Sequence, residues 1–124
     1  MPGTIIFKPI EAKFNDNPAN IDKVDPFCKF KIGFHSGSSI AARPIEGNVK
    51  WSDYVTVPRK HDETYATFKV KDSGILGLGK TLGEGKVDLE LVLANKKIVQ
   101  WFDIYDKDEV SGQVLLEVEY WPPM

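Results

Sequence analysis

Cysteine is nearly absent from this sequence, since Cys28 is the only one among 124 residues. A lone thiol cannot close an intramolecular disulfide, which excludes the disulfide frameworks of small secreted domains and favours a reducing compartment, the cytoplasm. Long apolar runs are also missing: no segment approaches the ~18 residues of a membrane span, and the N-terminal residues lack the features of a signal peptide. Any membrane contact is therefore expected to be peripheral.

The sequence also lacks a large excess of charge of one sign. Its formal net charge is -2 and its pI is about 5.7, which argues against nucleic acid as a partner and leaves only local patches for binding phosphates. With 124 residues, of which 42% are hydrophobic, the chain has the usual size of one domain with one core. We expect a single domain over residues 1–124, with its core within about residues 4–121.

Apolar residues recur with a period of two in short runs separated by Gly, Pro, Asn and Asp, which is typical of antiparallel strands. The clear runs are residues 10–14, 28–32, 51–57, 66–70 and 114–120, and the weaker ones are residues 40–43, 87–91 and 98–104. Residues 87–94 also suit a helix, but a strand is preferred, and residues 35–39 are expected to form a Gly/Ser loop. Eight strands predict an all-β fold, an eight-stranded antiparallel Greek-key β-sandwich.

The alternation also places individual side chains. Cys28 shares the phase of the core residues and is expected to be buried and unreactive. Trp51 and Trp101 are expected in the core, and Trp121 on the surface after the final strand. The two histidines lie far apart in sequence, on expected loops, and no acid/base pair or nucleophile constellation emerges. The chain is therefore not expected to be an enzyme.

Several short motifs carry a resemblance to a known family. In chain order they are Ala12, the Asp-Pro-Phe triplet at 25–27, Trp51, the run at 68–72, Gly83 and the closing strand at 112–120. Over nearly its whole length the sequence resembles the C2 domain, a family that binds calcium and phospholipid. The Gly-x-Val-x-Leu-x-Val-x-Tyr strand lies last here, which resembles the permutation called type II topology.

The resemblance implies a calcium site between loops at one end of the sandwich. It places five ligand positions at Ala19, Asp25, Asp72, Gly74 and Lys80, of which two keep a carboxylate. A calcium ion takes about 6 to 8 oxygen ligands, so each missing acid weakens the site. The ammonium group of Lys80 adds repulsion toward a cation and favours a phosphate or an acidic side chain. A degenerate site is expected, and with it no cofactor.

A slip of register in the long first loop brings in two more acids, Asp16 and Asp22. With Asp25 and Asp72 they would restore a weak calcium site, which is the alternative cofactor hypothesis. In the other interpretation Asp25 and Asp72 organise turns through hydrogen bonds between side chain and backbone.

Residues 74–81 match the phosphate-loop pattern Gly-x-x-x-x-Gly-Lys-Ser/Thr at every fixed position. Such a loop must lead from a buried parallel strand into a helix. Gly83 and Gly85 would then fall in the first helical turns, where each costs roughly 1 kcal/mol relative to Ala. The rest of the chain also lacks alternating strands and helices. Nucleotide binding is therefore the least favoured hypothesis.

Two surfaces remain as candidates for docking. At the tip of a C2 loop, Ile75, Leu76 and Leu78 would project beside Lys80 toward a bilayer or a partner's cleft, unless they fold back over the core. Four lysines at alternate strand positions are predicted to share an outer sheet face, where some C2 domains carry a basic patch for phosphoinositides; a plain solvated face is the other interpretation. They are Lys29, Lys31, Lys69 and Lys71.

Together these features predict a stand-alone C2-type docking or scaffold module in the cytoplasm. It would bind a protein assembly or an anionic phospholipid membrane without obligate calcium, and attach peripherally to a membrane or a cytoskeletal assembly. Protein docking is slightly preferred because acids lie near the lysines in the sequence. The alternatives are a calcium-dependent phospholipid-binding C2 domain and, from another class, a nucleotide-binding protein that uses residues 74–81.

Overall fold

The computed structural model describes residues 2–15, 24–45, 48–73 and 80–123. This part of the chain forms nine strands and one short helix. They are β1 (Gly3–Phe14), β2 (Pro26–Ile32), β3 (His35–Ser38), β4 (Val49–Lys50), β5 (Val55–Arg59), β6 (Tyr65–Asp72), β7 (Thr81–Asp88), α1 (Leu89–Asn95), β8 (Lys97–Asp106) and β9 (Glu109–Trp121). Within these described ranges, no helix has the length and apolarity to cross a bilayer.

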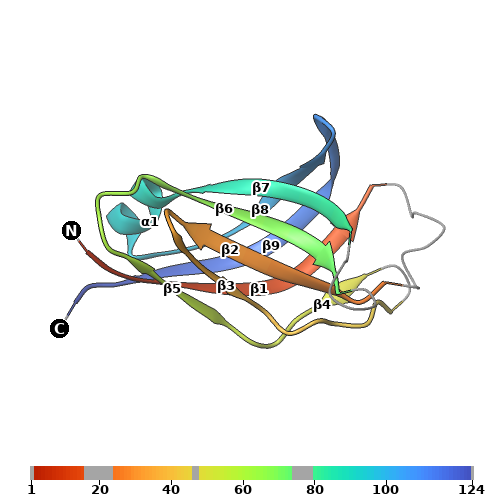
Figure 1. The fold of residues 1–124 in the computed structure, drawn as a ribbon, viewed down its shortest axis with the longest axis horizontal. Coiled ribbons are helices and arrows are strands. Elements are labelled where there is room, and N and C mark those ends of the chain that lie inside the picture. The colour runs from red at the N-terminus through yellow and green to blue at the C-terminus, as the bar shows by residue number, and fades with distance from the viewer. Residues whose placement is uncertain (1, 16–23, 46–47, 74–79, 124) are drawn as a thin grey trace.

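The strands form a β-sandwich, as predicted. Every strand pair is antiparallel, and the strand order is β3-β2-β6-β7-β8-β9-β1-β4, with β5 also paired to β1. The first layer contains β3, β2, β6 and β7, and the second contains β8, β9, β1, β4 and β5 (Figure 1). Strand β7 of the first layer pairs with β8 of the second layer at a single position, Glu84 with Tyr105, and this pair connects the two layers. Helix α1 and both chain ends lie at one end of the sandwich, and β1 ends and β2 begins at the other.

The core fills the space between the layers with alternate residues of each strand. Four phenylalanines make a continuous set of ring contacts across it: Phe7 stacks on Phe30 with centroids 4.4 Å apart, Phe30 lies 6.0 Å from Phe68, and Phe68 meets Phe102 edge-on at 6.0 Å. Phe7 and Phe102 belong to the second layer, and Phe30 and Phe68 to the first. These rings therefore hold the two layers together.

Cys28 lies in this core, as predicted. Its backbone N–H donates a hydrogen bond to Ser39 Oγ at 2.9 Å. Burial, and secondarily the negative charge of Asp53, raise the pKa of the Cys28 thiol far above its ordinary value. The thiol is therefore neutral and unreactive in the folded protein.

Three elements differ from the sequence prediction. Residues 40–43 form no strand; instead, Ile40 N–H donates to Asp53 Oδ2 at 2.8 Å and Ala42 N–H to the Pro26 carbonyl at 2.9 Å. The predicted loop at 35–39 contains strand β3, which pairs with β2 across a turn where Gly33 has φ of 58°, a conformation that suits glycine. Residues 89–95 form α1 rather than a strand, because Asp88 caps the helix by accepting from the Glu90 and Leu91 N–H groups.

Strand β7 was predicted only at its end, from residue 87, and it contains two glycines, Gly83 and Gly85. Both are required by close packing, Gly85 against a neighbouring strand of its own layer and Gly83 against the second layer. A Cβ atom on Gly85 would lie 2.6 Å from Phe68 Cζ, and one on Gly83 would lie 2.8 Å from Ile104 Cδ1. The glycines therefore let neighbouring core side chains approach the β7 backbone.

The tryptophans are split between core and surface. Trp51 is buried, as predicted, and its indole N–H donates to the Pro26 carbonyl at 3.1 Å. The prediction for Trp101 is wrong: alternation along β8 directs Phe102 and Ile104 inward and leaves Trp101 37% exposed, with Lys13 Nζ 4.8 Å from its ring. Trp121 is exposed, as predicted. His35, expected on a loop, belongs to β3.

Candidate functional site

Asp25 and Asp72, the two acids of the predicted calcium site, are close neighbours at the start of β2 and the end of β6. Asp72 Oδ1 accepts a hydrogen bond from the Asp25 backbone N–H at 3.1 Å. The Asp25 carbonyl accepts from Ser73 N–H at 3.0 Å, and Asp72 N–H donates to the Lys80 carbonyl at 2.9 Å. These hydrogen bonds hold the start of β2, the end of β6 and the residue before β7 close together. The Asp72 carboxylate therefore already has a structural role.

The Asp25 carboxylate faces a cation from the protein itself. Its Oδ1 lies 3.8 Å from Arg43 Nε, in an ion pair that is largely exposed to solvent. A calcium ion at this position would compete with Arg43 for the Asp25 carboxylate and with the Asp25 amide for Asp72. The described residues of the site thus supply two carboxylates, both already engaged, whereas a calcium ion takes about 6 to 8 oxygen ligands.

The remaining members of two predicted sites lie outside the described residues. These are Asp16 and Asp22 of the alternative calcium site, and Ile75, Leu76 and Leu78 of the proposed loop tip. Within the described ranges, no three acidic, histidine or cysteine side chains converge on a common point. Lys80 is described and is exposed. The contact role of the loop tip stays a prediction.

The four predicted lysines do gather on one sheet face. Lys29 on β2 is the direct register partner of Lys69 on β6, and Lys31 lies two residues along, opposite Thr67. Lys71 lies opposite Phe27 on the same side of β6, because side chains alternate along a strand. All four project from the outer face of the first layer, away from the phenylalanine core.

A fifth lysine, Lys86 on β7, joins this group and was missed from the sequence. It lies opposite Thr67 in register, and its Nζ is 4.1 Å from the centroid of the Tyr65 ring. Glu84, Lys86 and Asp88 occupy every second position and therefore share the exposed face of β7. This pattern places Lys86 on the face only if residues 81–88 are recognised as a strand. We call Lys29, Lys31, Lys69, Lys71 and Lys86 the lysine face.

Acidic residues offset only part of this charge. Glu84 lies opposite Lys69 in register, with 3.8 Å between its Oε2 and Lys69 Nζ, and both groups are about half exposed. A solvent-exposed pair of this kind leaves most of the lysine charge available. Asp88, two residues beyond Lys86 on β7, is a second exposed acid on this side. Five lysines against these two acids leave a positive excess, although the whole chain has a net charge of -2.

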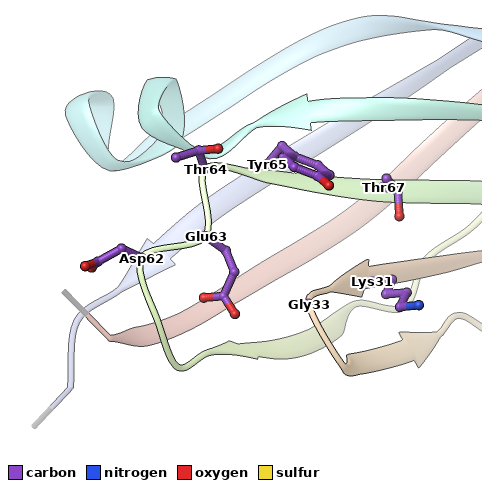
Figure 2. A pocket seen from close by; sticks show the side chains of 7 residues that line it. All are labelled: Lys31, Gly33, Asp62, Glu63, Thr64, Tyr65 and Thr67. Atoms are coloured by element: carbon purple, nitrogen blue, oxygen red, sulfur yellow. The ribbon is translucent and has the colours of Figure 1, made fainter.

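A hollow of about 460 Å³ continues the lysine face toward the α1 end of the sandwich. Figure 2 shows Lys31 on β2, Tyr65 and Thr67 on β6, and Asp62, Glu63 and Thr64 on the segment that enters β6. Glu63 Oε1 accepts from the His61 backbone N–H at 2.9 Å, and the Glu63 carboxylate lies over the turn at Gly33. The carboxylates of Asp62 and Glu63 therefore mark the boundary of the positive region at the α1 end of the lysine face.

The described end of the phosphate-loop motif differs from the setting that a nucleotide-binding loop requires. Thr81, the last residue of the pattern, opens strand β7 and pairs with Lys71 of the antiparallel neighbour β6. A phosphate loop requires a helix at this point, with its N-terminal N–H groups directed at the ligand. The strand that begins here offers no such group of N–H donors, because its backbone is paired with β6.

Comparison with known proteins points to one fold. No family model matches the sequence, and no curated protein gives a significant match. Solved structures do match. A C2 domain-containing protein superposes with a TM-score of 0.85 at 18% identity, covering 99% of this chain and 91% of that chain. A C2 domain of plant Extended Synaptotagmin 1 gives 0.76 at 17% identity, covering 98% and 96%. A structure with two C2 domains of Extended-Synaptotagmin 2 gives 0.75 at 19% identity, covering 95% and 40%.

The chain therefore has the C2 fold, as the sequence motifs implied. The motif residues have identifiable structural roles in it: Trp51 bonds the carbonyl of Pro26, and Gly112 leaves no room for a Cβ atom against the Lys13 carbonyl. The assignment to type II topology stays a prediction.

Proposed function

We propose, on the basis of its C2 fold, that this chain is a non-enzymatic docking module that attaches peripherally to an anionic phospholipid membrane without obligate calcium. The lysine face carries the proposal, because Lys29 and Lys69 lie side by side and Lys31, Lys71 and Lys86 surround them. The preference for a protein partner rested on acids near the lysines in sequence. In space, Glu84 is the acid that the structure pairs with a lysine on this face.

The expected affinity is modest and reversible. A lysine close to an anionic bilayer contributes about 1 kcal/mol, and the effect falls off within a Debye length. Five lysines, partly offset by Glu84, would therefore supply roughly 3 to 4 kcal/mol at low salt, which falls as the ionic strength rises. Such a module would attach where anionic lipid is abundant in the bilayer, and it would be released when salt screens the lysine charges.

The structural tasks that Asp25 and Asp72 already have support the proposed independence from calcium. Asp72 bonds the Asp25 amide, and Asp25 lies beside Arg43. Binding through the lysine face, on the outer side of β2, β6 and β7, requires no metal bridge. The calcium-dependent alternative would need Asp16 and Asp22 to complete a site with these two residues.

Vesicle sedimentation tests the proposal directly. Vesicles of phosphatidylcholine with and without phosphatidylserine are compared in chelator and in millimolar calcium. The test variant is Lys29→Glu with Lys31→Glu, and the matched control is Lys50→Glu with Lys107→Glu, which changes the net charge equally at exposed positions outside the lysine face.

We expect binding that requires phosphatidylserine, persists in chelator and falls at least tenfold in the lysine-face variant, with less than a threefold change in the control. An equal loss in both variants would mean that net charge alone acts, and the lysine face would have no role. Binding that appears only with calcium would replace the proposal by the calcium-dependent alternative.

A further inference from the structure

The second layer has an apolar hollow on its outer face, on the opposite side of the sandwich from the lysine face. It has a volume of about 610 Å³ and lies over β5, β1 and β9, beside the residues that follow β9. We call it the aromatic groove and define it by Ile6, Tyr54, Thr56, Trp121, Pro122 and Pro123.

Strand register fixes how these residues are arranged. Ile6 on β1 lies between Thr56 on β5 and Glu119 on β9, and Thr4 lies opposite Trp121. Tyr54 immediately precedes β5, so it lies at the other end of the same strands. Two strand spacings of about 4.8 Å and four residues of about 3.4 Å separate Tyr54 from Trp121 by roughly 17 Å. The groove therefore has an aromatic side chain at each end and a mixed floor between them, in which Ile6 is flanked by Thr4, Thr56 and Lys8.

Both aromatic side chains remain open to solvent. Tyr54 is 67% exposed and Trp121 is 57% exposed. The Trp121 indole is nevertheless held in place, because its N–H donates to Glu119 Oε2 at 2.6 Å. A ring that is exposed and already oriented loses little conformational entropy when it contacts a ligand.

One lysine, Lys8, and two glutamates line the groove. Lys8 is the register partner of Glu117, so the position that favours a cationic residue is the Trp121 end, at Glu119. Glu117, which also lines the hollow, forms an ion pair with Lys97 at 3.4 Å. Glu119 receives only the neutral indole N–H, and among the described residues no ion pair neutralises it. Its negative charge lies at the Trp121 end of the groove and would repel an anionic membrane.

We propose that the aromatic groove binds a proline-rich peptide segment of a partner protein, with a lysine or arginine beside Glu119. Extended polyproline II segments dock into grooves lined by aromatic side chains, and they lose little entropy because they are already stiff. At about 3.1 Å per residue, five or six residues of such a helix span the roughly 17 Å between Tyr54 and Trp121. The inference is independent of the proposed function, since the two surfaces lie on opposite faces.

The test uses nuclear magnetic resonance of the ¹⁵N-labelled full chain. Its three indole N–H signals report three environments: Trp121 in the groove, Trp51 in the core and Trp101 on the surface of β8. The probes are a blocked decapeptide of prolines ending in two arginines, a Gly/Ser peptide with the same arginines, and the proline peptide ending in two glutamates.

We expect the proline-arginine peptide to shift the Trp121 indole signal and leave Trp51 and Trp101 unchanged. Trp121→Leu and, separately, Tyr54→Leu should each weaken binding at least tenfold, with Trp101→Leu as the matched control. Glu119→Gln keeps an acceptor for the indole but removes the charge, so it should weaken binding of the arginine peptide about threefold and strengthen binding of the glutamate peptide. Tyr54→Leu decides the outcome if Trp121→Leu fails to fold.

Three results would overturn the inference. The first is no Trp121 shift up to millimolar peptide. The second is equal binding of the Gly/Ser-arginine peptide, which would show charge attraction alone. The third is a dimer in sedimentation that is lost in Trp121→Leu, which would make a second copy of the chain the occupant.

Discussion

Replacing Asp72 separates its two assigned roles, calcium ligand and turn organiser. Asp72→Ala removes the acceptor of the Asp25 N–H, a hydrogen bond of 3.1 Å in a half-buried place. A hydrogen bond to a charged acceptor contributes about 1.5 to 3 kcal/mol when buried, and partial exposure lowers this to about 1 kcal/mol. For a chain of 124 residues this loss corresponds to a fall in Tm of about 3 to 5 °C. Asp72→Asn keeps an acceptor oxygen and should recover most of it.

The assay is thermal unfolding followed by circular dichroism, for the native chain and both variants, in chelator and in millimolar calcium. If Asp72 organises the turn, Asp72→Ala melts lower in both solutions and calcium changes no Tm. A calcium ligand would behave in the opposite way, because removing one of several crowded carboxylates does not destabilise the metal-free protein. The reasoning is refuted if Asp72→Ala melts like the native chain in chelator and only the native chain gains stability from calcium.

Three further predictions concern the core. Phe30→Leu, which breaks the ring contacts between the layers, should cost about 1.5 kcal/mol in urea denaturation, whereas Phe34→Leu at the fully exposed β2-β3 turn should stay within about 0.5 kcal/mol of the native chain; equal losses would contradict this. Gly85→Ala should cost about 1 to 3 kcal/mol because its Cβ would meet the Phe68 ring, and an unchanged Tm would show that the ring can move. Burial raises the pKa of the Cys28 thiol, so in the folded state the thiol keeps its proton, whereas in the unfolded state it loses the proton above about pH 8.5. Above that pH, the unfolding free energy of the native chain should fall by about 1.4 kcal/mol per pH unit relative to that of Cys28→Ala. Parallel pH profiles of the two proteins would rule this out.

The strands that could be predicted are those whose side chains alternate between core and solvent. β2, β6 and β9 carry that pattern without interruption. Strand β3 has no apolar residue to reveal it, because Gly37 lies directly against Val55. In β7 the close approach of Phe68 replaces a side chain at Gly85, which removes the apolar signal from the sequence. Tertiary contacts, rather than local preference, decide both cases.

Helix α1 shows a different reason for failure. Its apolar residues suit a strand or a helix equally, and the deciding signal is the Asp88 side chain before them. For the sites, alternation brought the four predicted lysines together correctly, but Lys86 depended on recognising β7. The aromatic groove could not be predicted, because it joins residues near position 6, near 54 and near 121 that only the pairing of β1 with β5 and β9 brings together.

That pairing also determines when the protein can fold. Strand β1 lies between β5 and β9, with Thr4 opposite Trp121 and the Tyr120 hydroxyl donating to the Pro2 carbonyl at 3.1 Å. During synthesis, β1 leaves the ribosome before β9 and must wait for it before its second edge is covered. Closing so long a loop makes folding slow, and the exposed edge of β1 is open to wrong partners during that interval. Assistance by chaperones should therefore matter most in the interval before β9 emerges.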